Sequence, residues 1–115
     1  MFELEFYRLP DGSCPIEIFL DELPAKHRAK ALHSLSILEE FGSDLREPHS
    51  KPIGNGLFEL RIRFAGDISR IFYFFVINRR IILTNGFIKK TEKTPKSEIL
   101  LARKYKADYE GRHSE

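Results

Sequence analysis

The amino-acid sequence predicts an α+β fold: an antiparallel sheet, two N-terminal helices on one face of the sheet, and a C-terminal helix. Two observations lead to this prediction. Apolar and polar side chains alternate over residues 2–8, as in a half-buried strand, and residues 58–88 contain three further segments rich in β-branched and aromatic residues. Between these regions, apolar residues recur at helical intervals. The sheet therefore joins an N-terminal strand to a C-terminal meander of three strands.

The length and composition indicate one globular domain, residues 1–115, with one modest core. The beginning Met1-Phe-Glu-Leu-Glu lacks the basic and apolar segments of a signal peptide. The longest apolar run, residues 71–77, is too short to span a bilayer. The single cysteine, Cys14, excludes an intramolecular disulfide, and no Cys/His cluster has zinc-ligand spacing. We expect a cytoplasmic protein with no cofactor, no metal and no membrane partner.

Two helices follow the first strand. Ser13 is placed to cap a short helix over residues 14–23. Pro24 opens a second helix, and Gly42 is placed to end it. The apolar residues of this second helix lie three or four positions apart, or side by side: Ala31, Leu32, Leu35, Leu38 and Phe41. Residues 43–55 are expected to form a loop with a short extended piece around Pro52.

The meander has the strongest β pattern in the chain. Residues 58–64 alternate strictly, so their apolar side chains share one face. The charged residues on the other face are Glu59, Arg61 and Arg63. Residues 68–77 are almost all β-branched or aromatic, which indicates a central strand covered on both faces. The third strand, residues 81–88, leads into a lysine-rich segment, and Thr94-Pro95 opens a last helix that runs to about Tyr109.

The turn between the first two meander strands decides which cations meet. A two-residue turn at Gly66-Asp67 places Ala65 opposite Ile68. Arg63 and Arg70 then become direct neighbours with Cβ atoms about 5 Å apart. Like charges in this position are destabilising, so a bound polyanion would offset their repulsion. Two alternatives remain open: both arginines are solvated and paired with carboxylates such as Asp67, or a three-residue turn moves Arg70 to the opposite face.

The charge distribution supports a polyanion-binding surface. Residues 1–50 contain 5 Lys and Arg against 10 Asp and Glu, whereas residues 51–115 contain 14 against 7. The net charge of +2 therefore hides an acidic N-terminal half and a basic C-terminal half. We predict that the meander gathers five cations on one concave side: Arg61, Arg63, Arg70, Lys89 and Lys90.

The order of elements and three segments resemble the RelE/HigB superfamily of bacterial toxins. The segments are ELRIRF (residues 59–64), Arg70-Ile71-Phe72-Tyr73, and NGFIKKTEKTP (residues 85–95). The lysine-rich segment is the most specific and is similar to the phage-derived, HigB-like branch. The resemblance implies a RelE-like fold and the toxin of a type II toxin–antitoxin system, an endoribonuclease that enters the ribosomal A site and cleaves mRNA. It also implies a heteromeric complex with a helix-turn-helix, HigA-like antitoxin.

The resemblance also suggests roles for individual residues. Arg61 and Arg63 match the basic pair on the family's first meander strand, and Arg70 matches the arginine that opens the next. The basic cluster after the last strand corresponds to Lys89, Lys90 and Lys93. The residues assigned to RNA binding are Arg63, Lys93, Lys96, Arg79 and Arg80. The chain departs from the family in two ways. RelE has a tyrosine near its C-terminus, where this chain already runs into the last helix, and the HigB-type active-site histidines have no counterpart, since all four histidines lie outside the meander. The general base is therefore open.

Cleavage through the ribose 2′-OH needs deprotonation of that hydroxyl, stabilisation of the phosphorane and protonation of the 5′-oxygen. Arg70 is the expected phosphorane clamp, because a guanidinium matches phosphate oxygens bidentately. Lys89 and Lys90 would orient the scissile phosphate, and Arg61 completes the cationic site. A lysine with a lowered pKa, or Glu92, would transfer the proton. Glu92 and Lys93 are equally well explained as solvated charges near a helix start.

Two other functions fit the same fold: a ParE-like gyrase inhibitor, and an RNA-binding module without catalysis. Tyr73 is expected in the core, the four histidines on the surface, and Cys14 is not expected to be a nucleophile. The antitoxin would contact either the basic meander end or the acidic helices. The acidic residues of these helices are Asp21, Glu22, Glu39 and Glu40. We favour the helices, because the lysine-rich segment then stays accessible to RNA.

Overall fold

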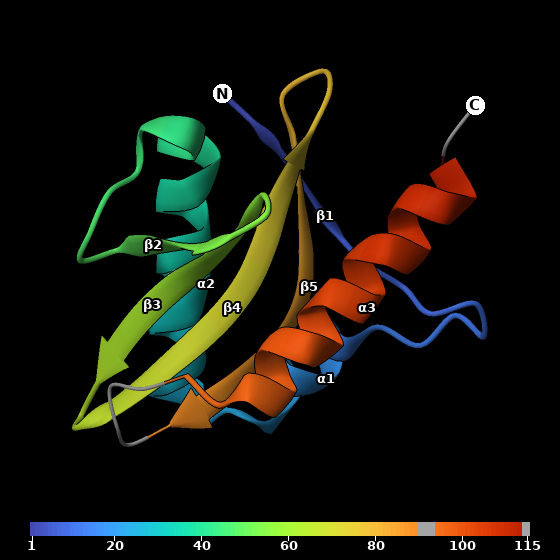
Figure 1. Cartoon of the computed structure of the whole chain (residues 1–115). Coiled ribbons are helices and arrows are strands. Elements are labelled where there is room, and N and C mark those ends of the chain that lie inside the picture. Colours follow the sequence, from blue (N-terminus) through green and yellow to red (C-terminus); the bar gives the residue numbers. More distant parts are fainter. Residues whose placement is uncertain (90–93, 114–115) are drawn as a thin grey trace.

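A computed structural model describes residues 1–89 and 94–113, and it confirms the α+β class (Figure 1). The strands are β1 (Glu3–Phe6), β2 (Ser50–Gly54), β3 (Leu57–Phe64), β4 (Asp67–Val76) and β5 (Arg80–Lys89). The helices are α1 (Pro15–Glu22), α2 (Ala25–Phe41), a short 3₁₀ turn η1 (Gly42–Asp44) and α3 (Lys96–His113). No helix within these described ranges has the length and apolar character needed to cross a bilayer.

The sheet has the strand order β1-β5-β4-β3-β2. Strands β2 to β5 pair antiparallel, as expected for a meander, whereas β1 pairs parallel with β5. The prediction of a purely antiparallel sheet is therefore wrong at this edge. No hairpin joins β1 to β5, because both helices and three strands lie between them in the chain, and the connection leaves the direction of β1 free. The extended piece expected around Pro52 is strand β2.

Helices cover both faces of the sheet (Figure 1). Helices α1 and α2 pack on one face, against side chains such as Leu60 and Ile71. Helix α3 crosses the other face, where Ala102 packs on Phe72 and Tyr109 packs on Phe74. Neighbouring residues of β4 are therefore buried on opposite faces, which explains its continuous run of apolar residues.

The β3–β4 turn consists of Ala65 and Gly66, which have φ values of +50° and +87°. Two successive positive φ values are characteristic of the type I′ turn that suits a two-residue hairpin. Phe64 pairs with Asp67, so Arg61 faces Arg70 and Arg63 faces Ile68. The predicted Arg63–Arg70 pair is therefore wrong. Ala65 adopts a positive φ that the prediction assigned to glycine, so the turn begins one residue earlier and the strand pairing shifts by two residues. Because a shift of two residues does not change which face a side chain is on, Arg61, Arg63 and Arg70 stay on one face of the sheet.

One histidine does not follow the surface prediction. His27 is 2% exposed and its Nε2 lies in hydrogen-bond contact with the Ser69 hydroxyl, while its ring packs on Phe64 at 5.1 Å between centroids. Residues 27, 31, 35 and 38 form the stripe of α2 that faces the sheet, which is why a polar ring at position 27 is buried. This contact fixes the first half of α2 against the beginning of β4.

Candidate functional site

The centre of the predicted cationic face is an ion-pair network that includes Glu59. Arg61 Nε donates a hydrogen bond to Glu59 Oε2 at 2.7 Å, and Arg70 Nε lies 3.3 Å from the same oxygen. The side chains of Glu59 and Arg70 are fully buried, and that of Arg61 is 12% exposed. The alternation of β3 puts Glu59 and Arg61 on one face, and the observed register brings Arg70 directly beside Arg61. Glu59 therefore offsets the repulsion between the two guanidiniums.

A second element holds the same carboxylate. The Thr94 hydroxyl donates a hydrogen bond to Glu59 Oε1, so both carboxylate oxygens have a partner. Thr94 lies just before α3, and this bond connects the start of that helix to β3. Arg70 lies between Arg61 on β3 and Phe87 on β5, in the central strand, which explains its complete burial. Arg70 therefore has a carboxylate partner, but it is Glu59, not Asp67, and the pair is buried and not solvated.

This burial changes what Arg70 can do. A fully buried guanidinium that contacts Glu59 does not face solvent, so a phosphate approaching this face reaches Arg61 first. The charge of Arg70 stabilises the Glu59 carboxylate, to which Arg61 also donates a hydrogen bond. Sequence reasoning overlooked Glu59, although the pattern placed this carboxylate on the same face as two arginines. The position of Glu59 beside two arginines on one strand face was the signal in the sequence that could have identified it.

A pocket of about 300 Å³ opens above the network between β2, β3 and the start of α3. Its lining residues are Lys51, Pro52, Ile53, Glu59, Arg61, Thr94 and Ile99. Lys51 is exposed and lies directly opposite Glu59 in the β2–β3 pairing. Lys51 was not among the predicted residues, because its segment was assigned to a loop. The pocket thus has cations at its rim and a buried carboxylate at its base.

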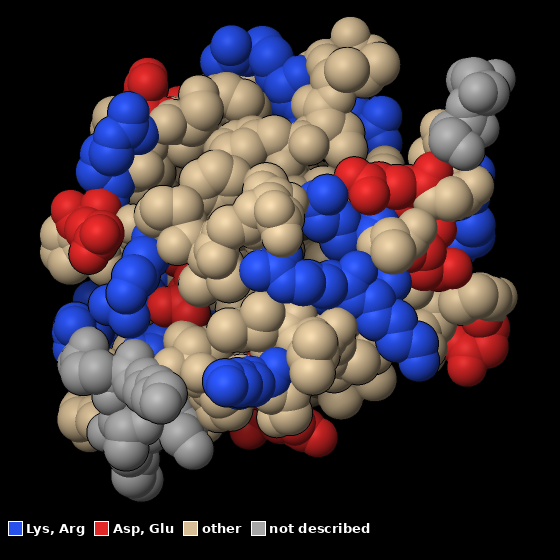
Figure 2. Space-filling model, in the orientation of Figure 1, with Lys and Arg blue, Asp and Glu red and all other residues tan. Residues whose placement is uncertain are grey.

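Most of the predicted cations belong to this end of the sheet. Arg63 is exposed, Lys96 is exposed at the start of α3, and the main chain of Lys89 pairs with Ile68. The side chain of Lys89, and the residues Lys90, Glu92 and Lys93, lie outside the described residues. Figure 2 shows one group of basic side chains at the left of the molecule and a second group over α3. The predicted convergence of Arg61, Arg63 and Arg70 on one face is therefore observed.

Arg79 and Arg80 lie at the opposite end of the sheet. Ten residues of β4 separate this end from the Ala65–Gly66 turn, a distance of roughly 30 Å in an extended strand. Arg80 Nη2 donates hydrogen bonds to Glu5 at 2.7 Å and to the Tyr109 hydroxyl at 2.6 Å. The Arg79 guanidinium lies 4.2 Å from the centroid of the Phe2 ring. The structure does not bring these two arginines to the cluster, and their contacts connect β1, β5 and α3.

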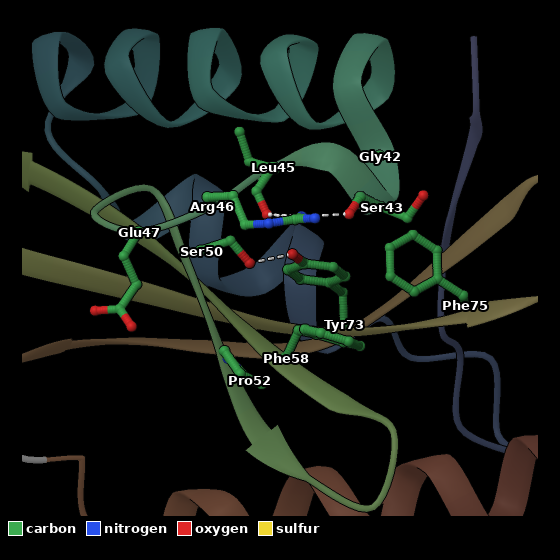
Figure 3. A pocket seen from close by; sticks show the side chains of 10 residues that line it. All are labelled: Gly42, Ser43, Leu45, Arg46, Glu47, Ser50, Pro52, Phe58, Tyr73 and Phe75. Carbon is green, nitrogen blue, oxygen red and sulfur yellow. Dashed lines mark hydrogen bonds between the residues drawn. The ribbon is translucent and has the colours of Figure 1, made fainter.

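A larger pocket, of about 440 Å³, lies on the α2 side of the sheet (Figure 3). Its wall consists of the rings of Phe58, Tyr73 and Phe75, whose centroids are 5.4 to 5.8 Å apart. The hydroxyls of Tyr73 and Ser50 are hydrogen-bonded to each other, and burial raises the pKa of Tyr73. Arg46 donates to the carbonyl oxygens of Ser43, at 2.7 Å, and Leu45, at 3.3 Å. This pocket suits an apolar or aromatic group, and Tyr73 is confirmed as a core residue.

A model of the phage-derived Gp49-like family (DUF891) matches residues 18–107. The matched segment extends from α1 into α3 and includes the whole Glu59–Arg61–Arg70 network. No curated protein matches the chain.

Proposed function

The chain belongs to the phage-derived Gp49-like family (DUF891), which is associated with RelE/HigB-type toxins, and on this basis we propose that it is the toxin of a type II toxin–antitoxin pair. In this proposal it is an mRNA interferase of the HigB type that needs the ribosome. It cleaves the message in the A site by attack of the ribose 2′-OH on the adjacent phosphate, without a metal.

Arg61 is the residue best placed to stabilise the phosphorane. Its guanidinium borders the pocket above the network, and Glu59 holds it at Nε, which fixes the direction of the guanidinium fork. Donors that are oriented before the reaction stabilise developing negative charge more effectively than mobile ones. A guanidinium also matches the geometry of two phosphate oxygens, which an ammonium does not. Arg70 becomes a positioning residue in this mechanism.

The other predicted or exposed basic residues near Arg61 would bind the RNA on either side of the scissile phosphate. Lys51 and Lys96 are exposed at the pocket and at the start of α3, and Arg63 is exposed two residues beyond Arg61. Lys89 and Lys90 follow the same end of the sheet in sequence and stay our candidates for orienting the scissile phosphate. Glu92 or a lysine of this segment would transfer the proton, and Lys93 would contact the RNA.

The observation that carries the proposal is the buried Glu59–Arg70 pair beneath Arg61. Replacing a buried ion pair by apolar side chains of similar volume is often neutral or stabilising. A sheet under selection for stability alone would therefore gain nothing from these two charges. The two buried charges are explained if Glu59 and Arg70 serve to hold the Arg61 side chain in one orientation at the opening of the pocket.

We propose that a helix-turn-helix antitoxin inhibits the toxin from the side of α1 and α2. The acidic end of α2, with Glu39 and Glu40, adjoins η1, which contributes Gly42 and Ser43 to the aromatic pocket in Figure 3. An antitoxin with basic residues around one apolar side chain would complement this surface. Its bulk would then keep the toxin out of the A site.

The test is cleavage of mRNA on programmed ribosomes, with products mapped by primer extension. We expect cuts within the A-site codon, products ending in a 2′,3′-cyclic phosphate, and no cuts in the same mRNA without ribosomes. An Arg61→Ala variant serves as the inactive control. Inhibition of gyrase supercoiling without cleavage would favour the ParE-like function. RNA binding without cleavage by the wild-type protein would leave only a binding module.

A further inference from the structure

A groove of about 250 Å³ lies along the edge of the sheet, between β3 and α2. Strand β2 begins at Ser50, opposite Leu60, so the last residues of β3 continue beyond it at the edge. The backbone N–H of Arg61 donates to the carbonyl oxygen of His49 at 2.8 Å, which fixes the segment before β2 at this point. The groove is lined by Lys30, His33, Ser34, Ile37, Pro48, His49, Arg61 and Arg63.

Helix α2 presents two stripes of different character. Residues 27, 31, 35 and 38 face the core, as described above. Residues 30, 33, 34 and 37 follow the spacing of a second helical face and line the groove. Lys30 and His33, one turn apart, are both exposed on this second face. Helix α2 therefore carries Lys30 and His33 to the edge where β3 ends.

Among the described residues that line this groove, every ionisable side chain is basic. The pocket above the network differs from the groove in charge, because its lining includes the carboxylate of Glu59. Arg61 lines both, so the groove continues from the proposed cleavage pocket over the edge of the sheet to α2. Arg63, exposed on the same strand, lies along this route. A continuous series of basic side chains next to a cleavage pocket matches the regular phosphates of a nucleic-acid strand.

We infer that this groove binds the phosphodiester backbone of single-stranded RNA beside the cleavage pocket, through Lys30, His33, His49 and Arg63. The inference rests on the proposed function and adds α2 to its substrate-binding surface. Contacts to phosphates position a strand without reading its bases. The groove therefore sets the path of the message, and Arg61 remains at the point of reaction.

The experiment measures the affinity of the full-length chain for a short 2′-O-methyl RNA oligonucleotide over a range of salt concentrations. The methylated 2′-oxygen cannot attack the phosphate, so the probe stays intact. We expect Lys30→Ala to weaken binding about 2- to 5-fold and to reduce the slope of log affinity against log salt by about 0.7, the value for one phosphate contact on a single strand. The double variant Lys30→Ala, His33→Ala should lose about 10-fold. Lys104→Ala, an exposed lysine of α3 on the other face of the sheet, is the matched control and should bind as wild type.

Thermal unfolding of each variant shows that a loss of affinity is not a loss of fold. Unchanged affinity and slope in the Lys30 and His33 variants overturn the inference, even if ribosome-dependent cleavage is found. Absence of RNA binding by the wild-type chain also overturns it. Binding that depends on Lys30 without cleavage on ribosomes supports the groove and rejects the nuclease. If inorganic phosphate or polyglutamate binds with the same Lys30 dependence while the oligonucleotide does not, the ligand is free phosphate or an acidic protein segment, and the inference is wrong.

Discussion

The side chains of Arg70 and Glu59 lie against each other, with 3.3 Å between Nε and Oε2, and neither is exposed. Two charges removed from water depend on each other, because loss of one leaves the other buried without compensation. Arg61 and Thr94 also donate hydrogen bonds to the Glu59 carboxylate. Arg70, the residue expected from the sequence to contact the phosphate, is thus buried against a carboxylate.

The first prediction follows from this dependence. Arg70→Ala should lower the free energy of unfolding by about 3–5 kcal/mol, because Glu59 stays buried beside a cavity. The double variant Glu59→Leu, Arg70→Met removes both charges with little change in volume, and it should be at least as stable as wild type yet inactive. Urea denaturation and ribosome-dependent cleavage measure the two effects. Full activity in the double variant would show that the network does not position Arg61.

The second prediction distinguishes the proposed role of Arg61 in catalysis from that of Glu59 and Arg70, which would hold it in place. Arg61→Ala should slow single-turnover cleavage about 100- to 1,000-fold, as expected when one oriented donor to the transition state is lost. Its unfolding free energy should change far less than in Arg70→Ala, because Arg70 still compensates Glu59 and the Arg61 side chain is partly exposed. Arg61→Lys should stay impaired, since an ammonium lacks the planar fork. Cleavage by Arg61→Ala near the wild-type rate would exclude this residue as the phosphorane donor.

A third prediction tests the register that brings Arg61 to Arg70. Ala65 has a φ of +50°, which costs an L-residue roughly 1–2 kcal/mol. Ala65→Gly should therefore raise the unfolding free energy by about 1 kcal/mol without moving the strands. Gly66→Ala should lower it by a similar amount for backbone reasons alone, because a Cβ at Gly66 meets nothing within 4 Å. A destabilised Ala65→Gly variant would argue against the type I′ turn and the observed pairing.

The turn also shows where sequence reasoning reached its limit. The central position of β4 was predictable, because a strand buried on both faces requires a continuous apolar run. The register was not, because alanine gives no sign that it will adopt a positive φ. Pairing between distant segments, such as parallel β1 and β5, leaves no local pattern either. The cationic face was predictable from alternation, whereas the burial of Arg70 depends on its place between Arg61 and Phe87, which only the register of the sheet fixes.

The fourth prediction concerns pH and the attachment of α3. The Tyr7 hydroxyl donates to Asp108 Oδ2 at 2.6 Å, and burial together with this bond raises the pKa of Tyr7 to about 12. The pKa of tyrosine in an unfolded chain is about 10. Since the folded-state pKa is higher, the neutral hydroxyl contributes stability that is fully present below about pH 10 and lost as the pH rises towards 12. Tyr7→Phe should lose less stability over this range, as urea unfolding at each pH would measure. An equal loss in both proteins would contradict the assignment.

The last prediction locates the antitoxin. If it docks on the helices, the charge reversal Glu40→Lys should weaken its binding, because Glu40 is exposed at the acidic end of α2. Ser43→Trp should weaken it as well, because Ser43 is exposed at the aromatic pocket and a large ring there would occupy it. The double variant Arg61→Ala, Arg63→Ala should bind the antitoxin as wild type does; it omits Arg70, whose loss would disturb the fold. Calorimetric titration of the purified antitoxin measures all three affinities at two salt concentrations. If the arginine variant loses affinity and the helix variants do not, the antitoxin carries carboxylates into the cleavage pocket, and inhibition is direct occupation of the site.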